Sequence, residues 1–223
     1  MPKVKMPRKS TAIDMTAMCD VAFLLLTFFM LATKFKPDEP VTVITPASIN
    51  TQVLPDADVM LFTVDKDGRV FFSMDGQPKR RKLIEDLNQQ YKLGLDETEL
   101  KNFAVGGSVG TDIKNLKAYL GMTPDQRKAS GLEKGIPTDS ASGELGQWIE
   151  YGTTAQAGTT GLNKLSYCIK ADNQTPYPVI HEILETFKRK HIQKLNLVTN
   201  LEAIPKGTAA DLAQQQEDKA AAK

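Results

Sequence analysis

The chain has 223 residues, which is enough for one domain of ordinary size with attachments and too few for a multidomain enzyme. Its 28 Lys and Arg residues balance 27 Asp and Glu residues, so the overall charge gives no sign of a nucleic-acid partner and none is expected. The hydrophobic fraction of 41% and the mean hydropathy of −0.30 are typical of a globular protein, but the longest apolar run is concentrated near the N-terminus.

That apolar run predicts a transmembrane helix over residues 13–33. As a helix, its 21 residues would span roughly 31 Å, close to the hydrocarbon thickness of a bilayer. Four basic residues, at positions 3, 5, 8 and 9, precede the run without any acid among them. By the positive-inside rule, residues 1–12 form a cytoplasmic basic arm, and the chain after residue 33 lies outside the inner membrane.

A cleaved signal peptide followed by a secreted soluble domain is the alternative for the same residues. Two features oppose it. The hydrophobic region of a signal peptide rarely carries an acid such as Asp20, and small residues spaced three apart are missing before a cleavage point. Sequencing of the mature N-terminus separates the two interpretations, because a start beyond residue 30 would eliminate the membrane helix.

Asp20 is the most informative residue of the chain. An ionised carboxylate in the apolar part of a helix costs about 2.5–3.5 kcal/mol, so it normally faces a partner or a hydrated cavity. On a helix, Thr16, Asp20 and Thr27 fall on one narrow polar stripe, which predicts a proton relay. The alternative is a structural acid that lies near the headgroups or pairs with another helix. In either case a lone helix cannot enclose the acid, so a membrane partner is expected.

Two stretches of the span carry a family resemblance. The residues DMTAMCDV at positions 14–21, followed by FLLLTFFM at 23–30, are similar to the signature of the ExbD/TolR family, the single-span subunits of proton-driven inner-membrane motors. Asp20 corresponds to the family's protonatable aspartate. Asp14 stands where the family usually has Asn, and Ala17 stands where it has Pro. The start of the helix is therefore the part of the span that differs from the family pattern.

A second match lies at 165–200, which resembles the family's strand ending in Ala-Asp, a helix opening near a tyrosine, and a last strand ending in Thr. The resemblance implies a periplasmic location for the chain after the span. It also implies a homodimer inside an ExbB/TolQ-like membrane oligomer in the lipid bilayer, with a TonB-like or TolA-like periplasmic transducer and no cofactor.

Residues 34–57 are predicted to form an extended periplasmic linker, because they contain four prolines and no helical periodicity. Within the linker, residues 41–44 alternate in the manner of a strand. The simplest interpretation is a tether or an edge strand. The resemblance implies more, since the family's linker carries a hydrophobic motif that adds to a sheet edge and helps to control the motor; residues 41–48 match it. The predicted partner-binding residues are Val41, Val43, Ile44 and Pro46.

Residues 58–205 are predicted to form an α+β domain in the order β-β-α-(insert)-β-α-β, with two helices packed on one sheet. A hairpin is expected around the turn at 65–68, followed by a helix over 79–93. The basic residues 79–82 are predicted to form a solvated face of this helix. The alternative is that they form a partner-binding patch. The later elements are a strand through Leu165, Tyr167 and Ile169, a helix with Ile180, Ile183, Leu184 and Phe187 facing the core, and a strand through Leu195, Leu197 and Thr199.

An insertion is predicted at about 94–163, where twelve of the 15 glycines fall. Short helices are expected there at 111–120, at 124–134 after a Thr123 cap, and at 144–151. The insertion elaborates the domain and is a candidate contact surface. Residues 206–223 are rich in Ala and Gln and are predicted to be a disordered tail or a fraying helix.

The sequence does not predict an enzyme. Cys19, in the membrane span, and Cys168, in a strand, are not expected to form a disulfide. His181 and His191 lack the neighbours that a metal site or a nucleophile with its base would need. Two functions therefore compete: a subunit of a motor driven by the proton motive force, and a passive membrane-anchored scaffold or binding protein in which Asp20 only holds helices together.

Overall fold

The computed structural model describes residues 15–32, 41–49, 55, 57–139, 143–159 and 165–202. The chain divides into two compact units, Met1–Pro37 and Asp38–Lys223. The predicted basic arm at 1–12, the tail at 206–223 and much of the linker lie outside the described residues.

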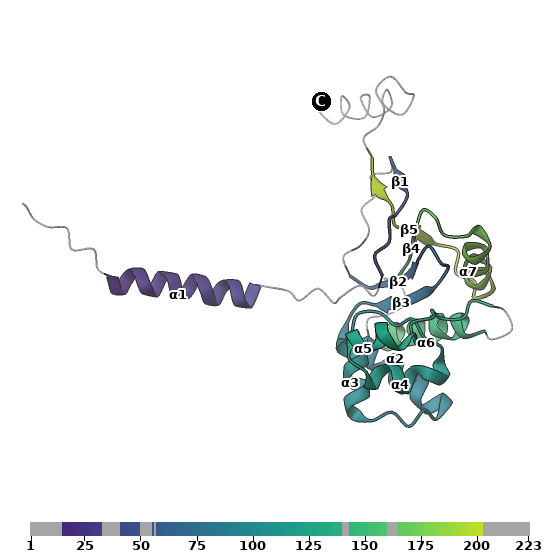
Figure 1. Ribbon diagram of the computed structural model, residues 1–223, viewed down its shortest axis with the longest axis horizontal. Helices are drawn as coiled ribbons and strands as arrows, with labels where there is room; N and C mark the ends of the chain where they lie inside the picture. Colours follow the sequence, from purple (N-terminus) through teal and green to yellow (C-terminus); the bar gives the residue numbers. More distant parts are fainter. Residues whose placement is uncertain are drawn as a thin grey trace, which may run out of the picture. The chain divides into compact units, whose positions relative to one another are not determined.

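The described part of the first unit is one helix, α1 (Met15–Ala32) (Figure 1). Its 18 residues are long and apolar enough to cross a membrane, and none of them is buried within the protein. The helix predicted over 13–33 therefore forms. Ala17 lies in its first turn, where the backbone N–H has no carbonyl partner within the helix, so the exchange of the resembling family's proline for alanine removes no hydrogen bond of α1.

The second unit is built on a four-stranded sheet with the order β3-β2-β4-β5 (Figure 1). Its strands are β2 (Val59–Val64), β3 (Val70–Met74), β4 (Ser166–Ala171) and β5 (Leu195–Leu197). Strands β2 and β3 are antiparallel, whereas β2 with β4 and β4 with β5 are parallel. A separate pair joins β1 (Ala47–Ser48) to β6 (Asn200–Leu201).

The turn between β2 and β3 forms where the sequence predicts it. The Gly68 amide donates to the Asp65 carbonyl at 3.0 Å, and the Asp65 amide donates to the Arg69 carbonyl at 3.1 Å. Gly68 has φ 81°, a left-handed conformation that glycine adopts without steric cost. This turn sets the register in which Phe62 lies opposite Phe72 and both point to the same face.

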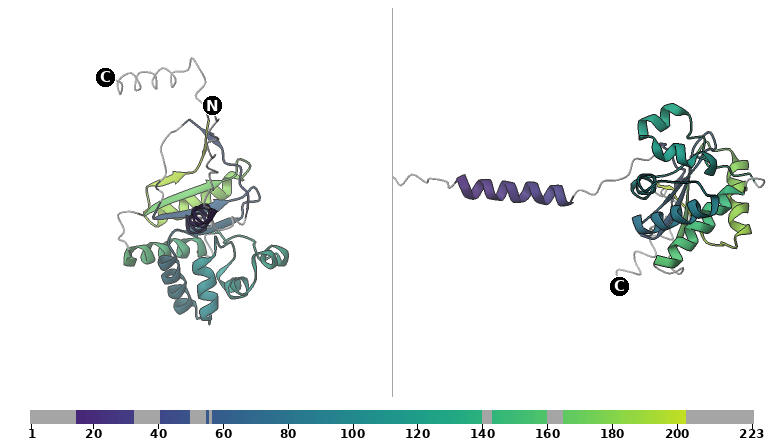
Figure 2. Two further views of the ribbon diagram at one scale, coloured as in Figure 1. Left: turned by 90° about the vertical axis from the view of Figure 1, so that its left-hand side faces the viewer. Right: turned by 90° about the horizontal axis from the view of Figure 1, so that it is seen from below.

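Seven helical segments complete the second unit among the described residues. They are α2 (Gln77–Tyr91), α3 (Glu97–Val105), η1 (Ile113–Asn115), α4 (Leu116–Gly121), α5 (Pro124–Ser130), α6 (Glu144–Thr159) and α7 (Tyr177–Arg189). The predicted Thr123 cap is confirmed as a capping box with Gln126. Helix α3 is not predicted from the sequence, and α6 continues eight residues beyond its predicted end at residue 151. Figures 1 and 2 place α3 and α4 at the opposite end of the domain from β1 and β6.

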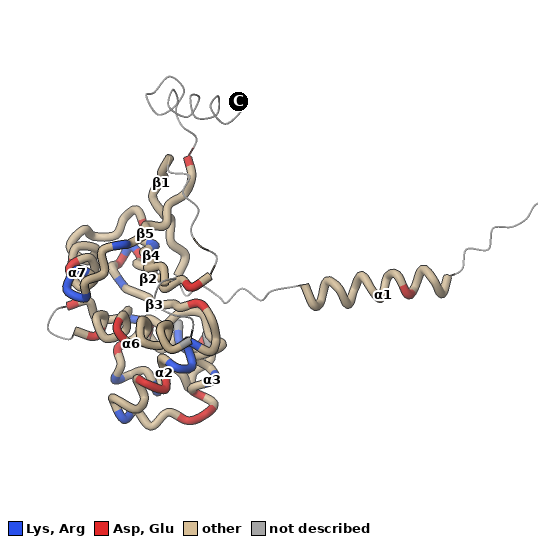
Figure 3. The backbone as a smooth tube through the Cα atoms, turned by 180° about the vertical axis from the view of Figure 1, so that it is seen from behind, with Lys and Arg blue, Asp and Glu red and all other residues tan. Residues whose placement is uncertain are grey.

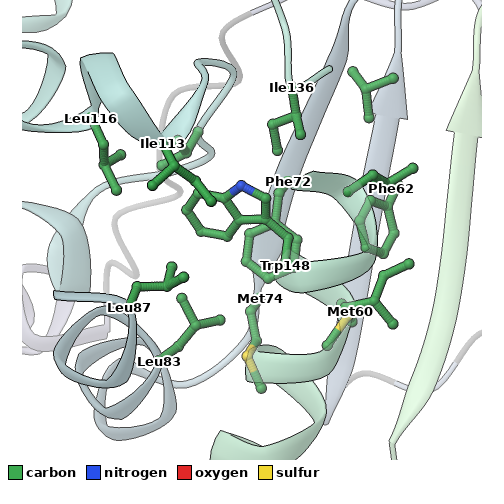
Figure 4. Close-up of a cluster of buried hydrophobic side chains, with 14 of the residues drawn as sticks. Met60, Phe62, Phe72, Met74, Leu83, Leu87, Ile113, Leu116, Ile136 and Trp148 are labelled. Atoms are coloured by element: carbon green, nitrogen blue, oxygen red, sulfur yellow. The ribbon is translucent and has the colours of Figure 1, made fainter. Parts of the chain in front are cut away.

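The α+β class is confirmed, but the insertion adds a third helix to the layer that covers the sheet. Trp148 of α6 is completely buried, with its ring 5.2 Å from that of Phe72 on β3 (Figure 4). It lies 6.1 Å from the ring of Phe103 on α3. Phe187 of α7 lies 5.2 Å from Phe62 on β2. Since Phe62 and Phe72 share a face, α6 and α7 pack on the same side of the sheet.

One residue of the predicted core stripe on α7 faces outward. Ile183 and Phe187 are buried, but Leu184 is 39% exposed. A helix turns about 100° per residue, so Leu184 lies at the margin of the apolar stripe, and no element covers it among the described residues.

The prediction that the basic residues 79–82 form a solvated face is wrong for two of the four residues. Lys79 and Arg80 are buried, whereas Arg81 and Lys82 are exposed. Arg80 donates from Nη2 to the Gly107 carbonyl at 2.7 Å and lies over the Phe103 ring, so the insertion covers it. Burial lowers the pKa of Arg80 to about 10.

Candidate functional site

The first candidate site is the polar stripe on α1. Because the helix is continuous, Thr16, Asp20 and Thr27 fall within about 40° around its axis, as predicted. Asp20 is the single charged residue of α1, visible in Figure 3 as its one acidic segment. The Thr27 hydroxyl donates to the Leu24 carbonyl at 2.9 Å, so this side chain is satisfied inside the helix.

The chemistry of this stripe is that of a carboxyl group on an apolar surface. Asp20 is exposed on α1, where the side chains around the rest of the helix are mainly Leu, Phe, Met and Ala. Its ionised form is stable at membrane depth only against water, a cation or hydrogen-bond donors. Since its protonated form is neutral and tolerates an apolar environment, the group can link proton transfer to a change of surroundings.

The second candidate site is the strap, which we define as residues 41–49. At its end, β1 pairs in parallel with β6, in the register Ala47 with Asn200 and Ser48 with Leu201. The Asn200 amide donates to the Pro46 carbonyl, and the Glu202 amide donates to the Ser48 carbonyl, both at 3.0 Å. The last two residues of the stretch 41–48 therefore pair with β6 in a separate two-stranded sheet, and not with the edge of the four-stranded sheet.

The middle of the strap is held by the turn that follows β4. The Ile44 amide donates to Asp172 Oδ2, and the Asn173 amide donates to the Ile44 carbonyl, both at 2.9 Å. The Gln174 amide donates to Asp172 Oδ1 at 2.9 Å. The donors from Gln174 and Ile44 favour the carboxylate and hold the pKa of Asp172 below its ordinary value.

The structure places the four predicted partner-binding residues along the strap in two environments. Ile44 is 74% exposed, whereas Val41, Val43 and Pro46 are half-buried. The strand predicted over 41–44 is wrong, because the backbone groups of Ile44 bond to a side chain and a turn instead of a ladder. Pro46 has no N–H to donate, so regular pairing begins only at Ala47.

Asp172 is the functional candidate that the sequence analysis did not single out. The sequence marks this residue only as the end of a strand that closes in Ala-Asp. A local signal was present, since Asp followed by Asn-Gln-Thr-Pro is typical of a turn in which the carboxylate accepts backbone N–H groups. The second donor to this carboxylate, the Ile44 amide, lies 128 residues earlier in the chain. No sequence pattern predicts that hydrogen bond.

The segment formed by β5 and β6 has one open side. The Val198 amide donates to the Ile169 carbonyl and the Asn200 amide to the Pro46 carbonyl, so the even-numbered residues face β4 and the strap. The amide groups of Leu195, Leu197 and Leu201 point the other way. Among the described strands, none pairs along that side.

The remaining candidates for site chemistry are metal ligands and the two free thiols, Cys19 and Cys168. Within them, no group of three His, Cys, Asp or Glu residues is placed to hold a metal ion. Cys168 is buried in β4, as predicted, and its burial raises the pKa of the thiol. Burial therefore disfavours the thiolate, which is the reactive form of cysteine.

Comparison with protein families gives one match over nearly the whole chain. The family described as biopolymer transport protein ExbD/TolR matches residues 6–202, which include both α1 and the α+β unit. No curated protein and no solved structure matches the chain.

Proposed function

Because the chain belongs to the ExbD/TolR family of biopolymer transport proteins, we propose that it is the proton-responsive subunit of a motor driven by the proton motive force in the bacterial inner membrane. The motor would energise a TonB-type or Tol-type transport or envelope process. The observation that carries the proposal is Asp20, the one charge on an otherwise apolar helix of membrane-spanning length.

In this proposal Asp20 converts proton movement into movement of α1. A proton that crosses a potential of about 100 mV releases about 2.3 kcal/mol. That energy is comparable with the cost of about 2.5–3.5 kcal/mol for an ionised acid at membrane depth. The ionised form would face a hydrated or cationic surface of the partner, and the protonated form would cross an apolar one. Thr16 and Thr27 would extend the polar path along the same face.

Association with an ExbB/TolQ-type partner follows from the family. The finer arrangement is part of the proposal: a homodimer inside that oligomer, the N-terminus in the cytoplasm and the α+β unit in the periplasm. A TonB-like or TolA-like transducer would receive the motion. Support comes from the open side of β5 and β6, since unpaired backbone groups on an extended strand accept another strand.

The strap is proposed to control access to the partner. In the structure it occupies the inner side of β6 through Ala47 and Ser48. Its release would free that side for another strand and expose Val41, Val43 and Pro46, which are half-buried, next to Ile44. The bond from Ile44 to Asp172 holds the closed arrangement.

The proposal is tested by Asp20→Asn in the complex purified with its ExbB/TolQ-type partner. Proton influx into proteoliposomes, followed with an enclosed pH-sensitive dye, is expected to fall at least about tenfold, since an amide cannot carry the proton. The complex itself should still copurify. Asp14→Asn, the same exchange six residues earlier, is the matched control and should leave the influx unchanged.

The same experiment distinguishes the motor from the passive scaffold. Unchanged proton influx through an assembled Asp20→Asn complex would overturn the motor. A third outcome would show that the acid only packs helices together. In that outcome the Asp20→Asn complex fails to assemble, and neither Asp20→Glu nor a second carboxyl group one turn away restores assembly and influx.

A further inference from the structure

Strand β3 is the last strand of the sheet, yet its outer side is occupied. The Phe72 amide donates to the Val109 carbonyl at 2.7 Å, and the Val109 amide returns a bond of 2.8 Å to the Phe72 carbonyl. The Ile136 amide donates to the Val70 carbonyl at 2.8 Å. All of these partners lie in the insertion, in two segments that are more than 20 residues apart.

The two segments are also joined to each other and to the turn beside β3. The Gly135 amide donates to the Gly110 carbonyl at 2.9 Å. The Arg69 Nη1 atom donates to the Glu133 carbonyl at 3.2 Å. Residues 107–110 and 133–136, which we name the edge guard, therefore form one hydrogen-bonded unit along β3.

The fit of the edge guard requires glycine at two positions. Gly135 has φ 87°, and a Cβ atom there would lie 2.7 Å from the Val70 nitrogen. A Cβ atom on Gly110 would overlap the ring of Phe71. The backbone of the insertion thus approaches β3 as closely as a paired strand does, which loose packing of an inserted loop would not require.

We propose that the edge guard closes the β3 edge of the sheet against pairing with another protein chain and so confines strand pairing to the opposite edge, at β5. Strand β3 reads Val-Phe-Phe-Ser-Met, without the lysine or proline that commonly protects an exposed edge. Such a strand, left open, is a site for pairing with a second copy of the chain. The inference concerns the sheet alone and does not depend on proton-driven function.

The test uses the full chain in detergent, with the edge guard displaced. Val109→Pro removes the donor to the Phe72 carbonyl without adding bulk at a crowded position, and Gly135→Val adds atoms against Val70. Gly131→Val is the matched control, because Gly131 also has positive φ, at 66°, but has open space around it. Amide hydrogen exchange of β3 and the particle mass over a hundredfold range of concentration are measured.

Both displacing variants should raise amide exchange at Phe72 at least about tenfold and should form assemblies larger than the wild type as concentration rises. The control should match the wild type in both. The proposal is overturned if exchange rises and the mass distribution does not change, because β3 would then be open without pairing. It is equally overturned if exchange at Phe72 stays at the wild-type rate in every displacing variant that folds, because the edge guard would not be what protects β3. Val109→Pro decides the question if Gly135→Val does not fold.

Discussion

At the scale of single residues, two aspartates have opposite environments. Asp172 accepts two backbone N–H groups and holds a strap in place, so its charge is fixed by donors that come with the fold. Asp20 lies exposed on a mainly apolar helix, and in the proposed function a membrane partner surrounds it. The first is suited to positioning a segment, whereas the second is suited to changing state.

Because Asp172 holds the strap through its carboxylate, we expect the attachment of the strap to weaken at acid pH. Its folded pKa lies below the ordinary value of 3.8, so its contribution to holding the strap is present above that pH and is lost as the pH falls through the lower folded value. Amide exchange over 41–49, corrected for the intrinsic effect of pH, should therefore increase below about pH 4. Asp172→Ala should show the increased exchange already at pH 7.

Asp67→Asn is the control, because this carboxyl group lies on the β2–β3 turn, is 61% exposed and pairs with Arg69. Equal exchange over 41–49 in Asp172→Ala and the wild type at pH 7 would show that the pairing of β1 with β6 is sufficient without the carboxylate.

At the scale of elements, α6 is the helix whose importance the sequence did not reveal. It lies in the glycine-rich insertion, yet its Trp148 is buried against the sheet and against α3 (Figure 4). Gly152, one turn later, lets the helix approach the side chain of Met60 on β2. The insertion is therefore part of the core and not an appendage to it.

Trp148→Ala should lower the free energy of unfolding of the second unit by about 3–5 kcal/mol, since it removes a fully buried indole. Thr154→Ala, on the exposed face of the same helix, should change it by less than about 0.5 kcal/mol. Urea unfolding of the full chain followed by circular dichroism measures both. A loss below about 1 kcal/mol for Trp148→Ala would mean that α6 is not required to complete the core.

At the scale of the whole molecule, the buried core of the described residues belongs to the second unit. None of the residues of α1 is buried, and every buried hydrophobic residue of the described chain lies between Met60 and Phe187. In the proposed function α1 requires a membrane and a membrane partner, whereas the second unit is built on its own sheet and helices.

A chain that begins at Asp38 is accordingly expected to fold without α1. Its urea midpoint, at equal pH and salt, should agree with that of the second unit in the full chain, and the difference in free energy should stay within about 0.5 kcal/mol. A fragment that shows no cooperative unfolding would contradict this separation and would indicate that the membrane unit stabilises the fold.

The sequence by itself determined the local and periodic features. Hydrophobic length predicted α1, and alternation with a turn at Gly68 predicted the β2–β3 hairpin, because these depend on neighbours only a few residues away. The Thr123 cap and the polar stripe through Asp20 were predicted for the same reason.

Only the tertiary structure decided the features that join distant segments. The bond from Ile44 to Asp172, the burial of Arg80 under the insertion, and the pairing of Val109 and Ile136 with β3 each connect residues that are far apart in the chain. Such contacts depend on which surfaces the folded chain brings together, and a local pattern of residues does not encode that choice.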